Sequence, residues 1–284
     1  MEFAVRSTDL RFLQLLRRLL GRFRVDQGPT EILFSADCGI ERGLPGGKVI
    51  RGRGRLYFQG LLIFKGGVQE EMAGRLVSGI RDWTNDQSNE FFRVRAGGVT
   101  LNGGALLLPS PPESHLPSLV ARLVGAGAGY LGDEIINVDP VLLQAHPLPL
   151  PLLLDAQDLR EFPRLQAGRE RPRRRRPSDD VSRRPRRPVL LEEIGGSPAP
   201  ASPIQWVVFP SFDPDGPTAL RPLSPSEALF RLTRASLNLH IWRDRAFVLM
   251  QKVLEGTPTA ELSVGSVADA AELLTTSLPS PERG

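Results

Sequence analysis

The chain has 284 residues, 40% of them hydrophobic, which is enough to bury the core of one large domain or two small ones. No apolar run reaches the roughly 20 residues of a transmembrane helix, so we predict no transmembrane segment. The single cysteine, Cys38, excludes an intrachain disulfide and favours a cytoplasmic location, and we expect it to pack as a small hydrophobe because no nucleophile motif surrounds it.

The N-terminal third is predicted to mix helices and strands. Leu10 to Phe23 has the pattern of a basic amphipathic helix, which either packs on its own domain or lies on a membrane surface. Strands are predicted over Glu31–Phe34 and Arg55–Phe64, and a second helix over Glu70–Trp83. Charged residues before the first apolar run argue against a secretory signal.

The most informative stretch follows, between Ala105 and Asp139. A short apolar run, Ala105–Leu108, predicts a buried strand, and apolar residues at helical spacing over Leu119–Val124 predict a helix that ends in a glycine-rich turn. Tyr130–Val138 is a second strand candidate and contains the acidic pair Asp133 and Glu134. Strand, loop, helix and acidic strand, in this order, form the layout of a phosphate-binding site.

The loop of this frame departs from a working phosphate loop, which reads G-x-x-x-x-G-K-[ST]. Leu116 stands where the lysine belongs and Pro117 where the first hydroxyl belongs, while Ser118 keeps a hydroxyl one residue later. Prolines in the loop lack the N–H groups that would bind phosphate. The candidate cofactor-binding residues of this degenerate loop are Ser110, Glu113, Ser114, His115, Leu116, Pro117 and Ser118.

The middle of the chain holds a lone histidine and a basic segment. His146 has no second His or Cys at metal spacing, so we expect a structural role and predict no metal site. Arg169–Pro188 carries ten arginines against three acidic residues, a surplus larger than the +4 of the whole chain. This composition predicts a disordered insertion. An acidic partner or RNA would bind it electrostatically, although no aromatic residues are interleaved for base stacking.

The C-terminal part is predicted to return to ordered α/β structure. Ile204–Phe209 has the pattern of a buried strand that ends at a proline. Ser224-Pro-Ser-Glu227 is a helix start, with serine at the cap, proline at the first helical position and glutamate three residues on. Ala246–Leu254 and Val267–Leu274 are further candidates for regular structure.

Several of these motifs resemble the HPr kinase-related serine kinases. The resemblance begins at Leu106-Leu-Leu-Pro-Ser-Pro111, Tyr130-Leu-Gly-Asp-Glu134 and His146-Pro-Leu-Pro149. It continues at Trp206-Val-Val-Phe-Pro210 and Pro222-Leu-Ser-Pro-Ser-Glu-Ala-Leu229. It implies an α/β fold with an HPr kinase or phosphoenolpyruvate-carboxykinase-like core and a smaller α+β N-terminal region. The implied boundaries are residues 1–92 for the N-terminal region, 93–155 and 203–276 for the core, and 156–202 for a disordered Arg/Pro-rich insertion.

The same resemblance implies roles for the candidate site residues. Asp133 would be the catalytic base and Glu134 would support magnesium, while the family's lysine corresponds to Leu116. Phosphoryl transfer depends on positioning and charge stabilisation, so the loss of the lysine, the glycines and the hydroxyl removes several interactions with the same phosphates. Asp133 and Glu134 are then vestigial catalytic residues.

Three functions remain open from the sequence. The leading hypothesis is a pseudokinase that needs no cofactor and serves as a binding or scaffold module for a protein or peptide. The second is a divergent serine kinase that uses Mg-ATP, with Arg95 or Arg122 as a replacement cation. The third is nucleic-acid binding through Arg169–Pro188. Self-association is implied by resemblance, since HPr kinases work as oligomers.

Overall fold

The computed structural model describes residues 2–25, 30, 32–39, 41–43, 49–51, 54–66, 68–87, 89–111, 115–166 and 185–278. The chain forms two compact units. The N-terminal unit contains Met1–Asp86 with Pro185–Val189, and the C-terminal unit contains Gln87–Arg184 with Leu190–Gly284. The division therefore falls after residue 86 rather than after 92. Within the described ranges, no helix is long and apolar enough to cross a bilayer.

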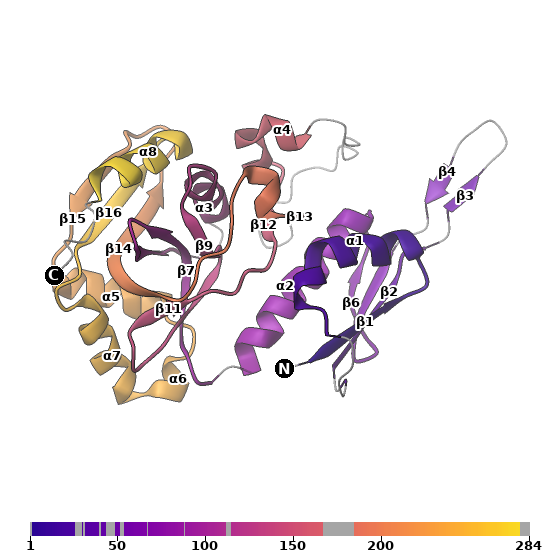
Figure 1. Cartoon of the computed structure of the whole chain (residues 1–284), viewed down its shortest axis with the longest axis horizontal. Coiled ribbons are helices and arrows are strands. Elements are labelled where there is room, and N and C mark those ends of the chain that lie inside the picture. Colours follow the sequence, from indigo (N-terminus) through magenta and orange to yellow (C-terminus); the bar gives the residue numbers. More distant parts are fainter. Residues whose placement is uncertain are drawn as a thin grey trace. The chain divides into compact units, whose positions relative to one another are not determined.

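The N-terminal unit is a four-stranded sheet with two helices (Figure 1). Its strand order is β1-β2-β5-β6, with β1 and β2 parallel and the other neighbours antiparallel. A short hairpin, β3 with β4, pairs separately. The elements are β1 (Phe3–Ser7), α1 (Leu10–Leu20), the 3-10 turn η1 (Gly21–Phe23), β2 (Ile32–Asp37), β3 (Glu41–Gly43), β4 (Val49–Arg51), β5 (Arg55–Phe58), β6 (Leu61–Lys65), α2 (Gln69–Gln87) and β13 (Arg187–Val189).

The predicted amphipathic helix is confirmed as α1, and it packs within its own unit. Asp9 caps α1 by accepting the backbone N–H of Phe12 at 3.0 Å, as expected for an N-cap aspartate. Phe12, Leu16 and Leu19 are buried, so the apolar face that a membrane helix would expose is covered by protein. The arginines at the end of α1 complement the negative end of its dipole.

The C-terminal unit is built on an eight-stranded mixed sheet. Its central strands β8, β14 and β16 are parallel neighbours, and β7 continues the sheet antiparallel to β8. The strands are β7 (Phe92–Leu101), β8 (Gly104–Pro109), β9 (Gly129–Gly132), β10 (Ile135–Val138), β11 (Gln144–His146), β14 (Ser202–Phe212), β15 (Ala219–Pro222) and β16 (Thr259–Val264), with β12 (Leu152–Leu154) outside this sheet.

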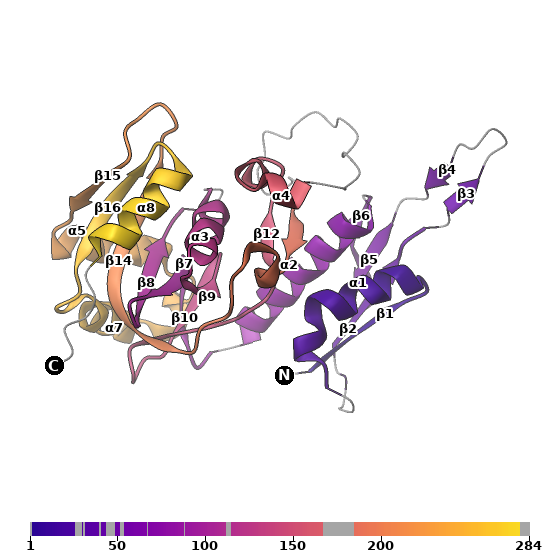
Figure 2. The same ribbon diagram turned by 45° about the horizontal axis from the view of Figure 1, so that its top comes forward.

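Helices cover both faces of this sheet, as parallel strands require (Figures 1 and 2). One face carries α3 (Leu116–Gly125) and α8 (Val267–Ser277), which contact each other. The other carries α5 (Pro225–Ala235), α6 (Leu239–Trp242) and α7 (Asp244–Leu254). The remaining elements are η2 (Asp158–Glu161), α4 (Pro163–Gln166) and η4 (Leu191–Ile194). The predicted α/β class is confirmed in this coarse form.

Three sequence predictions concern these elements and β13 of the N-terminal unit. The helix start at Ser224 is confirmed, because its hydroxyl accepts the backbone N–H of Glu227 at 3.3 Å. The single strand predicted over Tyr130–Val138 is wrong: it is broken into β9 and β10 at the acidic pair. The insertion predicted over 156–202 is too wide, since its described ends form η2, α4, β13 and η4.

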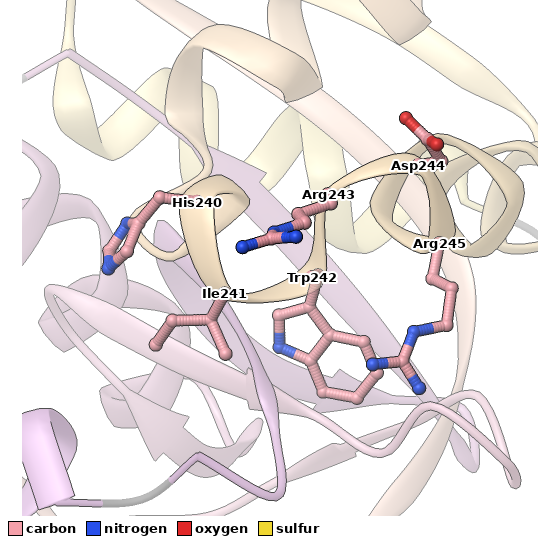
Figure 3. Close-up of a pocket in the computed structure, with 6 residues that line it drawn as sticks. All are labelled: His240, Ile241, Trp242, Arg243, Asp244 and Arg245. Carbon is pink, nitrogen blue, oxygen red and sulfur yellow. The ribbon is translucent and has the colours of Figure 1, made fainter.

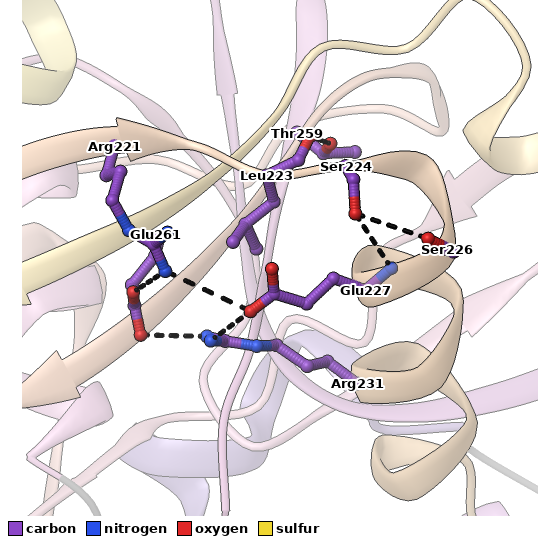
Figure 4. A network of polar contacts seen from close by, with 8 residues as sticks. All are labelled: Arg221, Leu223, Ser224, Ser226, Glu227, Arg231, Thr259 and Glu261. Carbon is purple, nitrogen blue, oxygen red and sulfur yellow. Dashed lines mark hydrogen bonds and ion pairs between the residues drawn. The ribbon is translucent and has the colours of Figure 1, made fainter.

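A surface network of ion pairs ties α5 to β15 and β16 (Figure 4). Glu261 accepts hydrogen bonds from Arg221 at 2.7 Å and from Arg231 at 2.9 Å. Arg231 also pairs with Glu227 one helical turn away. Hydrogen bonds from Arg221 and then Arg231 lower the pKa of the Glu261 carboxyl. The network therefore joins α5 to strands β15 and β16 through ion pairs on the surface.

Candidate functional site

The strand, loop and helix of the predicted site are present as β8 and α3, but the start of the helix is buried. Leu116, where the resemblance implies a lysine, is only 4% exposed. It packs over Gly97 of β7, where an added Cβ would lie 3.2 Å from the Leu116 side chain. Pro117 and Ser118 are buried as well. A side chain at position 116 therefore points into the core rather than toward a ligand.

A carboxylate from the chain itself lies beside the first turn of α3. The Ser118 hydroxyl donates to one carboxylate oxygen of Asp158 at 2.5 Å, and the Nδ1 atom of His115 lies 3.5 Å from the same oxygen. The ring of His115 packs edge-on against Phe212, at the end of β14. The N-terminus of a helix favours negative charge, so the Asp158 carboxylate lies in a favourable place beside the first turn of α3.

Asp158 is held by a second carboxylate in a tight turn. The backbone N–H of Asp155 donates to the other oxygen of Asp158 at 2.9 Å, and the backbone N–H of Asp158 donates back to Asp155 at 2.9 Å. Both side chains are buried. Burial favours the protonated form of Asp158, but hydrogen bonds from His115, Ser118 and the backbone of Asp155, with the charge of His115, lower the pKa of this carboxyl.

The acidic pair of the sequence analysis lies at the break between β9 and β10. Asp133 is buried, and its two oxygens accept hydrogen bonds from the Tyr130 hydroxyl and from the backbone N–H of Leu153, both at 3.1 Å. The backbone carbonyl of Glu134 accepts the N–H of Ala96. Asp133 therefore serves as an acceptor that fixes β12 to the end of β9.

Arg95 and Arg122, which the sequence offered as replacements for the lysine, lie on different elements. Arg122 lies on α3, 3.7 Å from the carboxylate of Glu161, and its guanidinium stacks over the ring of Phe162. It thus helps to fasten η2 on α3. Arg95 lies on β7, paired in register with Ile135. Within the described ranges, no group of three or more His, Cys, Asp or Glu side chains could hold a metal ion.

The structure describes only part of the predicted loop. Ser110 is buried at the end of β8, and its backbone N–H donates to the carbonyl of Arg95 at 3.3 Å. Glu113 and Ser114 lie outside the described residues. Of the described loop residues, His115 and Ser118 contact Asp158, a residue that the sequence did not predict for the site.

The signal for Asp158 was present in the sequence but weak. Asp155-Ala-Gln-Asp158 is a pattern in which aspartates cap a turn, as they do here. The partner Ser118 is 40 residues away, so no local spacing connects the two. The resemblance also drew attention to Asp133 instead.

His146, Cys38 and the basic segment have simpler outcomes. His146 stacks on Phe91 and lies 3.8 Å from Asp139, in agreement with a structural role. Partial burial raises the pKa of the Cys38 thiol to about 11, which disfavours a thiolate nucleophile. Most of Arg169–Pro188 lies outside the described residues, so its disorder and its binding of RNA stay predictions.

A hollow of about 470 Å³ opens at the turn between α6 and α7 (Figure 3). Six consecutive residues, His240 to Arg245, line it, and Arg245 stacks on Trp242. Arg243, at the turn, has a positive φ of 49°. None of the predicted site residues is in this lining, so the hollow is separate from the start of α3.

Neither protein-family models nor curated proteins give a match for this chain. The resemblance to HPr kinase-related proteins therefore rests on the motifs quoted above. In the structure, the buried carboxylate of Asp158 lies beside the first turn of α3, the helix that follows β8.

Proposed function

We propose that this chain is a pseudokinase of the HPr kinase-related type, which acts as a binding or scaffold module for a protein or peptide. One observation carries the proposal: the Asp158 carboxylate lies against Ser118 and His115 at the start of α3. A nucleotide phosphate brought to this place would meet a negative charge already held there.

The electrostatics of phosphoryl transfer support this proposal. Such a site needs cations and N–H groups that converge on the phosphates. Here Leu116 stands where the lysine is expected, and its apolar side chain packs on Gly97. Arg122 pairs with the Glu161 carboxylate and stacks on the Phe162 ring. Binding Mg-ATP would require the chain to move Asp158 away and to leave its hydrogen-bonded partners exposed or unpaired.

A divergent serine kinase is the second candidate, and the retained Asp133–Glu134 pair favours it. It predicts ATP-dependent phosphate transfer to an acceptor that disappears in Asp133→Asn. In the structure both oxygens of Asp133 accept hydrogen bonds from within the chain, which weighs against its use as a base. The pseudokinase therefore remains the better proposal.

Calorimetric titration with Mg-ATP tests the proposal. We expect no binding tighter than about 1 mM, equivalent to about −4 kcal/mol, in the native protein. Asp158→Asn removes the negative charge held at the start of α3, so the weak binding of Mg-ATP should become tighter in this variant and stay unchanged in the control. Asp213→Asn, in an exposed turn, is the matched control. Micromolar binding by the native protein, with the fold intact by circular dichroism, would overturn the pseudokinase assignment.

A further inference from the structure

An apolar strand lies at the edge of the N-terminal sheet. In the order β1-β2-β5-β6, strand β6 is outermost, and within the described ranges it pairs with β5 alone (Figure 1). Its first three residues are exposed: Leu61 by 71%, Leu62 by 53% and Ile63 by 47%. Edge strands of stable monomers are usually blunted by charges, prolines or bulges, and β6 has Lys65 and one bulge. Its three consecutive exposed apolar residues still need an explanation.

The backbone of β6 offers a ladder for another strand. The N–H of Gly66 donates to the carbonyl of Gly54 at 2.8 Å, so these two residues form a hydrogen-bonded pair. The next pair along the ladder is Lys65 with Arg55. Hydrogen-bonded pairs alternate in an antiparallel ladder, so the N–H and carbonyl of Lys65 are turned away from β5. A bulge opposite Tyr57 gives β6 an extra residue but leaves its apolar side chains exposed.

A strand that pairs with β6 would come either from a second copy of this chain or from another protein, and charge favours the second source. Residues 1–86 contain 14 Arg and Lys against 10 Asp and Glu, and Arg186 and Arg187 add to this unit. A second copy would bring a unit of the same net positive charge, including a second Lys65, to the pairing. Lys65 is the exposed charge at the end of β6, whereas Arg55 opposite it on β5 lies 3.8 Å from Asp37. An extended segment with an acidic residue at this end would complement Lys65.

We propose that β6 is a docking edge for an extended peptide of another protein, which joins the sheet as a fifth strand. Its apolar side chains would cover Leu61, Leu62 and Ile63, and an acidic side chain would face Lys65. Main-chain hydrogen bonds give such additions their affinity, and alternating side chains give them specificity. This inference names the partner class for the binding role proposed above and rests on that role.

A displayed library of random eight-residue peptides, panned on the native protein, provides the test. We expect enriched peptides that alternate apolar and acidic residues. Their binding should be lost in Leu62→Glu and kept in Leu10→Glu, an equivalent change at an exposed position on α1. Lys65→Pro removes one outward N–H and should weaken binding about tenfold relative to Lys65→Ala, which keeps it. Circular dichroism checks that each variant is folded.

Three results would overturn the inference. The first is a library from which no such peptide is enriched. The second is peptides that bind Leu62→Glu and Lys65→Pro as well as they bind the native protein. The third is a native dimer in sedimentation that Leu62→Glu dissociates, which would assign the edge to a second copy. Tight Mg-ATP binding would instead refute the pseudokinase assignment and leave the peptide result standing, so the two failures are distinguishable.

Discussion

The carboxylate at the start of α3 leads to a quantitative prediction for Asp158→Asn. The substitution keeps the shape of the side chain but removes its charge and one acceptor. The Ser118 hydroxyl then faces a neutral acceptor, which weakens a hydrogen bond of about 1.5–3 kcal/mol to one of about 1 kcal/mol. The N–H of Asp155 faces an amide nitrogen and loses its partner in a buried place, at a cost of about 1–3 kcal/mol. We expect a loss of about 2–4 kcal/mol at pH 7.

The pH dependence separates the charge from the packing of Asp158. Its pKa is lowered in the folded protein, so its charge stabilises the fold at a pH above the unfolded value of about 3.9. That contribution is lost as the pH falls through the folded pKa. The difference between native protein and Asp158→Asn should therefore be full at pH 7 and pH 5 and smaller at pH 3.

Urea unfolding followed by far-ultraviolet circular dichroism measures this difference at the three pH values. Asp213→Asn is the control, because its carboxylate accepts a backbone N–H in an exposed turn and its loss should change stability by less than about 0.5 kcal/mol. A loss at pH 7 no larger than that of the control, or one that is unchanged at pH 3, would refute the role given to the Asp158 charge.

Three further substitutions test the packing around the site and the sheet. Leu116→Lys buries an ammonium over β7 and should lower the unfolding free energy by several kcal/mol, whereas Leu10→Lys, at an exposed position, should change it little. Gly97→Ala places a Cβ within 2.5 Å of α3 and should cost about 1–3 kcal/mol in urea unfolding; an unchanged midpoint would contradict this contact. Glu261→Gln should cost about 1 kcal/mol or less in thermal unfolding, an effect that fades as the pH falls through the lowered pKa of the native carboxyl.

Local patterns predicted the elements well where each pattern is complete in sequence. The Ser224 cap, the proline after it and the glutamate three residues on all act within one turn, and α5 starts as expected. The apolar run of β8 is buried on both faces, so its composition alone identified it.

Patterns failed where distant segments decide the structure. Tyr130–Val138 is apolar enough for one strand, but β7 pairs with β9 over one half and with β10 over the other, and the chain breaks between them. In the same way, the loop motif predicted α3 but did not predict that β12 and η2 pack on it. Contacts between residues 40 apart depend on the whole fold.

Residues 152–161, here called the cover, contain β12 and η2 and pack on α3. Two carboxylates hold the cover in place. Asp133 accepts the N–H of Leu153, and Asp158 accepts the N–H of Asp155. One segment carries both amides, so exposing either to solvent should require the same opening. Hydrogen exchange should therefore give similar opening free energies for the two amides.

Ser118→Ala tests this coupling from the side of α3. Removal of the hydroxyl leaves the Asp158 carboxylate with fewer donors, and the opening free energy should fall by about 1–2 kcal/mol. If β12 and η2 lift as one cover, the fall is equal for the amides of Leu153 and Asp155. A fall confined to Asp155 would show that Asp133 holds β12 independently. Because both carboxylates are used as anchors, Asp133 would be released from its hydrogen bond to Leu153 only when residues 152–161 move away from α3.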